Sequence, residues 1–117
     1  MKSPESQLQS ACVMWFRLQY PALGRLMFAV PNGHYRSKRT ACILKGEGVV
    51  AGVADLILLV PNKKYASLCI EMKAGKGRQT ELQAQFQSAA ESVGNMYAVC
   101  RTFEEFQTTV NQYVHAR

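Results

Sequence analysis

Two neighbouring segments near the middle of the chain are rich in large apolar residues. Residues 55–60 and 66–73 have the composition and length that are typical of β-strands. The polar segment 61–64 between them predicts a tight connection, so the two strands are expected to form a hairpin. If the turn of this hairpin is centred near Lys63, Asp55 and Glu71 are direct cross-strand neighbours, and the Cβ atoms of such neighbours are roughly 4.5–5.5 Å apart.

Side-chain alternation places the polar residues of this hairpin on one face. Lys73 follows Glu71 by two positions and therefore points to the same side as Glu71 and Asp55. Two adjacent carboxylates at a buried strand end repel each other and are costly to desolvate, and a shared divalent cation relieves both costs. Mg²⁺ is typically held by one or two carboxylates, waters and phosphate oxygens. With a lysine beside it to orient water or stabilise charge, the pattern predicts hydrolysis of phosphodiester bonds.

A simpler interpretation is that Glu71 and Lys73 form an exposed surface pair and that Asp55 caps a turn. Against it, Asp55 is the only aspartate in the 117 residues, it opens an apolar strand, and it lies in register with Glu71. We therefore favour an active site at this end of the hairpin.

Capping residues and apolar periodicity predict the remaining elements. Ser3 and Pro4 begin a helix that ends at Tyr20, residues 26–30 form a first strand, and residues 37–45 form a short helix. After the hairpin we expect a helix from Thr80, a strand over 96–100 parallel to its neighbour, and a final helix from Thr102 that begins, like the one at Thr80, with a capping box. The expected apolar face of the helix from Thr80 comprises Leu82, Phe86, Ala89, Ala90 and Val93.

The resulting order, α-β-α-β-β-α-β-α, predicts an α/β fold in which helices flank a mixed four-stranded sheet. A chain of 117 residues is expected to form one domain, residues 1–117, around a single core.

The segment from Gly48 to Asp55, the Glu-x-Lys of residues 71–73 and the downstream Gln83 resemble the virus-type replication-repair nuclease domain, VRR-NUC, of the PD-(D/E)XK superfamily. Residues 31–33 and Arg36 are similar to the stand-alone phage and bacterial members. The resemblance extends from Glu5 to the last helix. One departure is Ala54, where many relatives have proline.

The resemblance implies a restriction-endonuclease-like core and a Mg²⁺- or Mn²⁺-dependent, structure-selective DNA endonuclease. Asp55 and Glu71 would be metal ligands together with the main-chain carbonyl of Met72, and Lys73 would be the catalytic lysine. Stand-alone members resemble homodimeric Holliday-junction resolvases, so the implied partners are a second copy and a four-way DNA junction. A nuclease of flaps or duplex, or a basic nucleic-acid-binding module without cleavage, remains an alternative.

Glu5 and Gln83 each allow two interpretations. Glu5 can complement the dipole of the first helix, or it can reach the metal, as a first-helix glutamate does in related nucleases, which we favour. Gln83 can complete a capping box with Thr80, or it can lie near the active site and assist catalysis, as the resemblance implies.

Charge favours a polyanionic partner, because the net charge is +6 and the isoelectric point is about 9.4. An exposed basic face without a partner is the alternative. The candidate DNA-binding residues are Asn32, Arg36, Lys38, Arg39 and Lys45 before the hairpin, and Lys76 and Arg78 in the glycine-punctuated loop after it.

The cysteines, Cys12, Cys42, Cys69 and Cys100, are widely spaced in apolar contexts. They are expected to be reduced core residues rather than zinc ligands. Without a secretory leader or a long apolar run, we expect a cytoplasmic protein that makes no membrane contact. The resemblance to the stand-alone members implies a phage or bacterial protein associated with the nucleoid.

Overall fold

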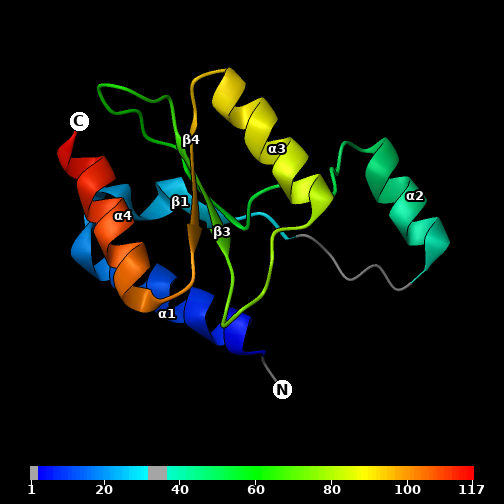
Figure 1. Ribbon diagram of the computed structural model, residues 1–117, viewed down its shortest axis with the longest axis horizontal. Coiled ribbons are helices and arrows are strands. Elements are labelled where there is room, and N and C mark those ends of the chain that lie inside the picture. Colours follow the sequence, from blue (N-terminus) through cyan, green and yellow to red (C-terminus); the bar gives the residue numbers. More distant parts are fainter. Residues whose placement is uncertain (1–2, 32–36) are drawn as a thin grey trace.

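The computed structural model describes residues 3–31 and 37–117. Within these ranges, four strands form one sheet in the order β1-β2-β3-β4, flanked by helices (Figure 1). The elements are α1 (Pro4–Gln19), a short 3₁₀ helix (Pro21–Leu26), β1 (Met27–Ala29), α2 (Lys38–Gly46), β2 (Leu56–Leu58), β3 (Leu68–Met72), α3 (Glu81–Ser92), β4 (Met96–Cys100) and α4 (Phe103–His115). This confirms the predicted α/β class and the predicted order of elements.

The predicted hairpin and the predicted parallel fourth strand are both present in the sheet. β1 and β2 are antiparallel, β2 and β3 are antiparallel, and β3 and β4 are parallel. Leu56 faces Ile70 and Leu58 faces Leu68, so the hairpin is centred on residue 63 as expected. The mixed four-stranded sheet is therefore confirmed, together with the predicted register of the hairpin.

The prediction of a tight connection between β2 and β3 is wrong. β2 ends at Leu58 and β3 begins at Leu68, so an ordered loop replaces a short turn. The side-chain oxygen of Asn62 accepts hydrogen bonds from the amides of Lys64 and Tyr65, at 2.9 and 2.7 Å. Its side-chain nitrogen donates to the carbonyl of Tyr113 in α4, at 3.2 Å. The loop is thus held against α4, which explains how a longer connection preserves the register.

The two faces of the sheet are covered by different helices. On one face, Leu56 and Ile70 are fully buried against Phe16 of α1 and Phe106 of α4. Complete burial of such a side chain contributes about 1.5–3 kcal/mol. The other face is smaller and packs against α3, with Cys69, Tyr97 and Ala90 as buried members and Phe86 beside them. Glu71 alternates with Ile70 and therefore lies on the α3 side of the sheet.

The helix caps agree with the sequence except in one detail. Ser3 accepts a hydrogen bond from the amide of Ser6, and Thr80 and Gln83 form a complete capping box. Thr102 also caps its helix, but the side chain of Glu105 accepts from the amide of Arg101, at 2.8 Å, rather than from the amide of the cap itself.

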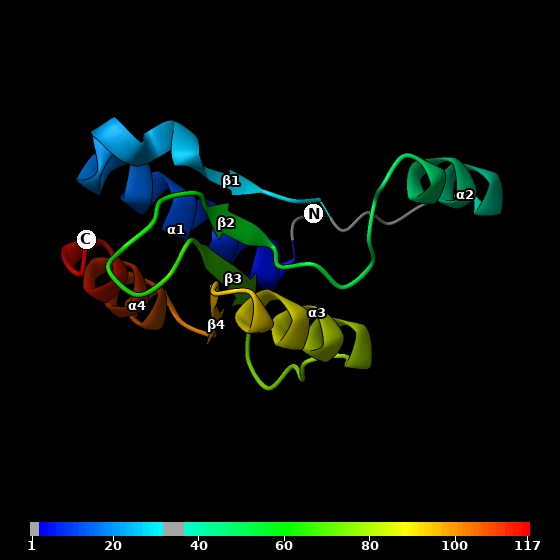
Figure 2. The ribbon, with the colours of Figure 1, turned by 90° about the horizontal axis from the view of Figure 1, so that it is seen from above.

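The expected apolar face of α3 is only partly buried, because 51% of Leu82 and 75% of Val93 are exposed. Helix α2 lies apart from the sheet (Figure 2) and contains no buried residue. Among the described residues, none of the helices is both long enough and apolar enough to cross a membrane.

Candidate active site

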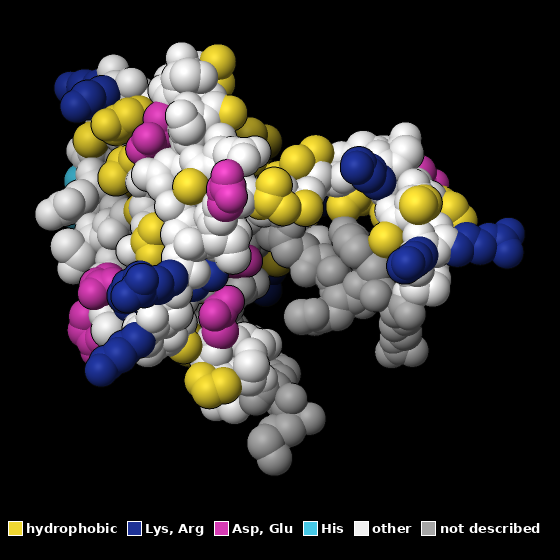
Figure 3. All heavy atoms as spheres, turned by 45° about the vertical axis from the view of Figure 1, so that its right-hand side comes forward, with side chains coloured by type: hydrophobic (Ala, Val, Ile, Leu, Met, Phe, Trp, Pro, Cys, Tyr) yellow, Lys and Arg dark blue, Asp and Glu magenta, His cyan; other side chains and the backbone are white. Residues whose placement is uncertain are grey.

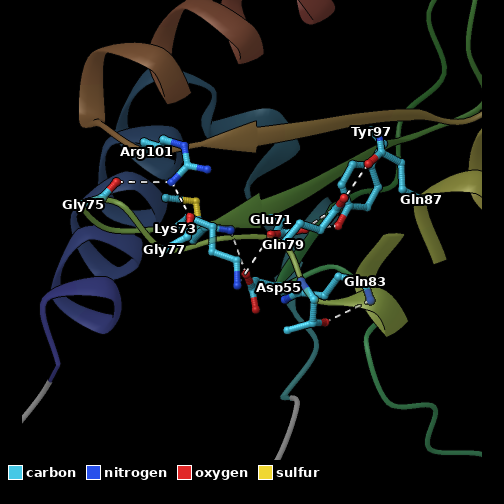
Figure 4. A network of polar contacts seen from close by, with 12 residues as sticks. Asp55, Glu71, Lys73, Gly75, Gly77, Gln79, Gln83, Gln87, Tyr97 and Arg101 are labelled. Carbon is cyan, nitrogen blue, oxygen red and sulfur yellow. Dashed lines mark hydrogen bonds and ion pairs between the residues drawn. The ribbon is translucent and has the colours of Figure 1, made fainter. Parts of the chain in front are cut away.

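The end of the β2–β3 pair brings Asp55, Glu71 and Lys73 together. Extending the observed register by one residue from Leu56 and Ile70 places Asp55 opposite Glu71. The Oδ2 atom of Asp55 accepts a hydrogen bond from the amide of Met72, at 2.7 Å, and the Nζ atom of Lys73 lies 3.7 Å from Oε2 of Glu71. Figure 4 shows the three side chains directed toward one another.

This arrangement excludes the simpler interpretation of an exposed ion pair. Glu71 is completely buried, and only 12% of the Lys73 side chain is accessible. Oε2 of Glu71 has no hydrogen-bond partner within the described part of the chain. A buried carboxylate oxygen without a partner is costly, so its presence calls for a specific explanation.

The electrostatics of Asp55 indicate an excess of negative charge at this point. Burial is the main cause that raises its pKa, and the charges of Glu5 and Glu71 raise it further. The hydrogen bond from Met72 and the charge of Lys73 act in the opposite direction without cancelling the shift. The charged form of Asp55 is therefore less favourable in the folded protein than in water, and a nearby cation would favour it.

The donor set fits a small, hard divalent cation. Asp55 and the unpartnered Oε2 of Glu71 offer carboxylate oxygens, and the adjacent main chain at Met72 offers a carbonyl oxygen. No group of three His, Cys, Asp or Glu side chains suited to a metal occurs among the described residues. A two-carboxylate site suits Mg²⁺, which retains several waters, better than it suits a metal that requires an all-protein cage.

A cavity of about 570 Å³ opens beside Asp55. Glu5 and Gln9 of α1 line one side of it, and Thr80 and Gln83 at the start of α3 line another. Glu5 therefore lies on the wall of the cavity that Asp55 lines and acts on Asp55 through its charge, although it does not join the two carboxylates in a three-ligand cluster.

Both interpretations of Gln83 have a structural counterpart. Its side-chain oxygen accepts from the amide of Thr80, at 2.8 Å, and its own amide donates to the Thr80 hydroxyl, at 3.2 Å. Gln83 also lines the cavity beside Asp55. The capping box therefore holds the side chain of Gln83 in place at the wall of the cavity.

Two polar neighbours of Glu71 escaped the sequence analysis. Tyr97 of β4 donates its hydroxyl hydrogen to Oε1 of Glu71, and Gln79 donates to the same oxygen from Nε2, at 3.2 Å. Burial and then the contact with Glu71 raise the pKa of Tyr97, which keeps this hydroxyl protonated. The parallel pairing of residues 96–100 with β3 could have placed Tyr97 on this face, but nothing in the sequence indicates the contact with Gln79.

The loop after Lys73 is anchored from β4. The guanidinium of Arg101 donates to the carbonyls of Gly75 and Gly77, at 3.2 and 2.6 Å (Figure 4). Lys76 and Arg78 of this loop are exposed. Arg101 therefore holds the main chain of a basic loop beside the carboxylates.

The other candidate DNA-binding residues lie on or before α2. Lys38, Arg39 and Lys45 are exposed, and Figure 3 shows basic side chains around this helix, apart from the main body. Asn32 and Arg36 lie outside the described residues.

The mixed four-stranded sheet with flanking helices agrees with the core that the resemblance predicted, and Asp55 lies opposite Glu71 at the end of its two central strands. The chain is similar to a solved structure described as "VRR_NUC domain protein", with a TM-score of 0.84 and 22% sequence identity over 99% of this chain and 92% of that chain. The likeness confirms, at the level of the fold, the resemblance predicted from the sequence. No family model matches the sequence, and no curated protein matches it.

The raised pKa of Asp55 predicts that a neutral amide at this position stabilises the protein in the absence of divalent cations. Between the ordinary pKa of aspartate and the raised value in the folded state, the folded protein binds more protons than the unfolded chain, so stability falls as pH rises. Asp55→Asn removes this loss and can still accept from Met72. In EDTA at pH 7 we expect the melting temperature of the variant to be higher than that of the wild type, because the neutral amide carries no cost of burying a charge.

Thermal unfolding of both proteins in EDTA from pH 3 to pH 8 measures this difference. It should shrink toward zero below the ordinary aspartate pKa of about 3.9. Added Mg²⁺ should raise the melting temperature of the wild type and have little effect on the variant. A variant that melts at or below the wild-type temperature at pH 7 in EDTA would contradict this interpretation of Asp55.

Proposed function

We propose that this protein is a metal-dependent DNA endonuclease that hydrolyses phosphodiester bonds. The observation that carries the proposal is the buried Glu71, whose unpartnered Oε2 faces Lys73 and lies opposite Asp55. A fold built only for packing or binding gains nothing from such a pair, since each buried carboxylate costs free energy that a cation or proton must offset. The likeness in fold to a VRR_NUC domain protein supports the same class of function.

The residues around the cation site have distinct roles in this proposal. Asp55, Glu71 and the main-chain carbonyl of Met72 would hold Mg²⁺ or Mn²⁺, which polarises the phosphodiester and acidifies a bound water. The Lys73 ammonium, already held near Glu71, orients the attacking water or stabilises charge that develops on the phosphate. Gln83, fixed by its cap on the cavity wall, contributes an amide near the reacting group.

Glu5 contributes a further negative charge on the α1 side of the cavity. Its charge acts on Asp55, but Glu5 forms no three-ligand cluster with the two carboxylates among the described residues. We therefore propose that Glu5 binds the cation through a water rather than directly. Mg²⁺ keeps several waters in protein sites, so a carboxylate outside the immediate ligand set still adds to its affinity.

DNA is the proposed substrate because the protein carries a net charge of +6 and presents exposed basic residues on two separate segments. Lys76 and Arg78 lie on the anchored loop next to Lys73, and Lys38, Arg39 and Lys45 lie on the projecting α2. Phosphate contacts of this kind position the DNA without reading its sequence. They favour a nuclease that recognises the shape of its substrate.

A four-way junction cut by a homodimer is the particular substrate that we propose. Two active sites related by a two-fold axis suit paired incisions in a two-fold-symmetric junction. Met14 and Leu18, one turn apart on α1, are 65% and 78% exposed. They offer an apolar strip that a second copy could cover.

Cleavage assays with end-labelled four-way junction, 5′ flap and linear duplex test the substrate preference. With Mg²⁺ or Mn²⁺ we expect symmetric incision of the junction at a rate at least about tenfold above that of the duplex, a difference of about 1.4 kcal/mol. Sedimentation of the protein–junction complex should give two protein chains for each junction. Faster cleavage of the flap or duplex would retain the nuclease and reject the junction, whereas metal-insensitive binding without cleavage would favour the binding module.

A further inference from the structure

A chain of hydrogen bonds reaches Glu71 from the α3 side of the sheet. Tyr97 and Gln79 both donate to Oε1 of Glu71. Gln79 also donates to Oε1 of Gln87, at 2.8 Å, and Gln87 donates to Glu91, at 3.3 Å. Figure 4 shows this chain extending from the carboxylate toward α3. The position of Glu71 is thus fixed by β4, by the loop before α3 and by α3 itself.

The two oxygens of Glu71 consequently differ in availability. Oε1 accepts two hydrogen bonds, whereas Oε2 accepts none from the described residues and has only the Lys73 ammonium nearby, at 3.7 Å. Hydrogen bonds to a carboxylate are charge-assisted and stronger than neutral ones. If the carboxylate turned to present both oxygens to one ion, the hydrogen bonds from Tyr97 and Gln79 to Oε1 would break. Glu71 can therefore bind an ion through Oε2 without loss, whereas binding through both oxygens costs these two hydrogen bonds.

Strand geometry explains why Tyr97 can reach this oxygen. Tyr97 is paired with Cys69, two residues before Glu71 on the same face of the sheet. Its long side chain extends along β3 from Cys69 to Glu71, the next residue on the same face of the sheet. The ring of Tyr97 packs beside that of Phe86, with the two ring centroids 6.2 Å apart. The ring is thus held by packing, and the hydroxyl can be removed without removing the packed ring.

We propose that Tyr97 and Gln79 are positioning residues that hold Glu71 as a one-oxygen ligand and so select a small divalent cation over Ca²⁺. This inference rests on the proposed metal-dependent function. Mg²⁺ requires near-octahedral geometry with short bonds to single oxygens, whereas Ca²⁺ accepts more ligands and often takes both oxygens of a carboxylate. Partners that orient a metal ligand typically contribute 10–100-fold to metal affinity or activity.

Binding of Mn²⁺ to the DNA-free protein tests this inference separately from cleavage. Electron paramagnetic resonance detects free Mn²⁺ in a titration, and competition with Mg²⁺ and Ca²⁺ gives the selectivity. Tyr97→Phe removes one donor and keeps the ring, and Gln79→Met removes the other in a half-buried loop residue. Each variant should bind Mn²⁺ about tenfold more weakly, and the competition ratio should shift toward Ca²⁺ relative to Mg²⁺.

Tyr20→Phe is a matched control, because the Tyr20 hydroxyl also donates to a side-chain oxygen, that of Asn111, away from the site. It should bind Mn²⁺ as the wild type does, with the same selectivity. Wild-type affinity in both site variants, or weaker binding without a change in the Ca²⁺:Mg²⁺ ratio, would overturn the inference and leave the proposed nuclease intact. A wild-type protein that binds no Mn²⁺ would overturn both.

Discussion

Glu71→Gln is expected to lower the single-turnover rate of DNA cleavage by about a thousandfold or more, equivalent to about 4 kcal/mol of transition-state stabilisation. Glutamine has nearly the size of glutamate and can still accept from Tyr97 and Gln79, so the local packing should persist. The substitution removes the negative charge and replaces one oxygen with an amide nitrogen, which does not bind Mg²⁺. DNA affinity measured in EDTA should stay within about twofold of the wild type or increase slightly, because one negative charge near the phosphates is lost.

Glu104→Gln provides the control for this substitution. Glu104 is an exposed residue in the first turn of α4, and its replacement makes the same change in charge outside the site. It should leave the cleavage rate unchanged. Thermal unfolding curves should first verify that both variants are folded. If Glu71→Gln then cleaves DNA at a rate close to that of Glu104→Gln, the assignment of Glu71 as a metal ligand is contradicted.

Gly52→Ala is expected to destabilise the protein by about 2–6 kcal/mol through two separate costs. Gly52 has a φ of +85°, a conformation that strains an L-residue by about 1–3 kcal/mol. A Cβ atom there would lie 2.6 Å from the main-chain carbon of Leu82 and 2.7 Å from its oxygen. Such overpacking costs about 1–3 kcal/mol more. Because Leu82 precedes Gln83 in α3, relief of this contact would also displace the cavity wall.

Gly48→Ala separates the two costs. Gly48 also has a positive φ, +104°, but an added Cβ atom would meet nothing within 4 Å. Urea or thermal unfolding should show a loss of about 1–3 kcal/mol for this variant and at least about 1 kcal/mol more for Gly52→Ala. Equal losses in the two variants would show that Leu82 moves freely, and they would contradict a tight contact between Gly52 and α3.

The sequence predicted the sheet well because alternation and symmetry constrain a hairpin strongly. A shift of one residue would have turned Glu71 toward Phe106 and Ile70 toward α3, exchanging a carboxylate for a core residue. The register that pairs residue 55 with residue 71 was therefore predictable without the turn. The turn itself was not, because the hydrogen bond between Asn62 and α4 depends on a residue about 50 positions away.

The candidate site was only partly predictable for the same reason. Asp55, Glu71 and Lys73 share one hairpin, so local geometry brings them together. Tyr97 reaches Glu71 from a strand whose place beside β3 follows from the topology of the whole sheet. Leu82 lines a groove together with Ala41 and Lys45 of α2, and 51% of it is exposed. Periodicity alone could not indicate how far the segment before the hairpin would cover this residue.

Metal-dependent cleavage of an end-labelled four-way junction by the wild-type protein and by Asp55→Asn, assayed side by side, is the most direct measurement. We expect the wild type to cut in Mg²⁺, to stop in EDTA and to resume when Mg²⁺ is added in excess. Asp55→Asn, which should be the more stable protein in EDTA, is expected to bind the junction without cutting it. Cleavage by the wild type that persists in EDTA, or equal cleavage by both proteins, would contradict a metal-dependent active site built on Asp55 and Glu71.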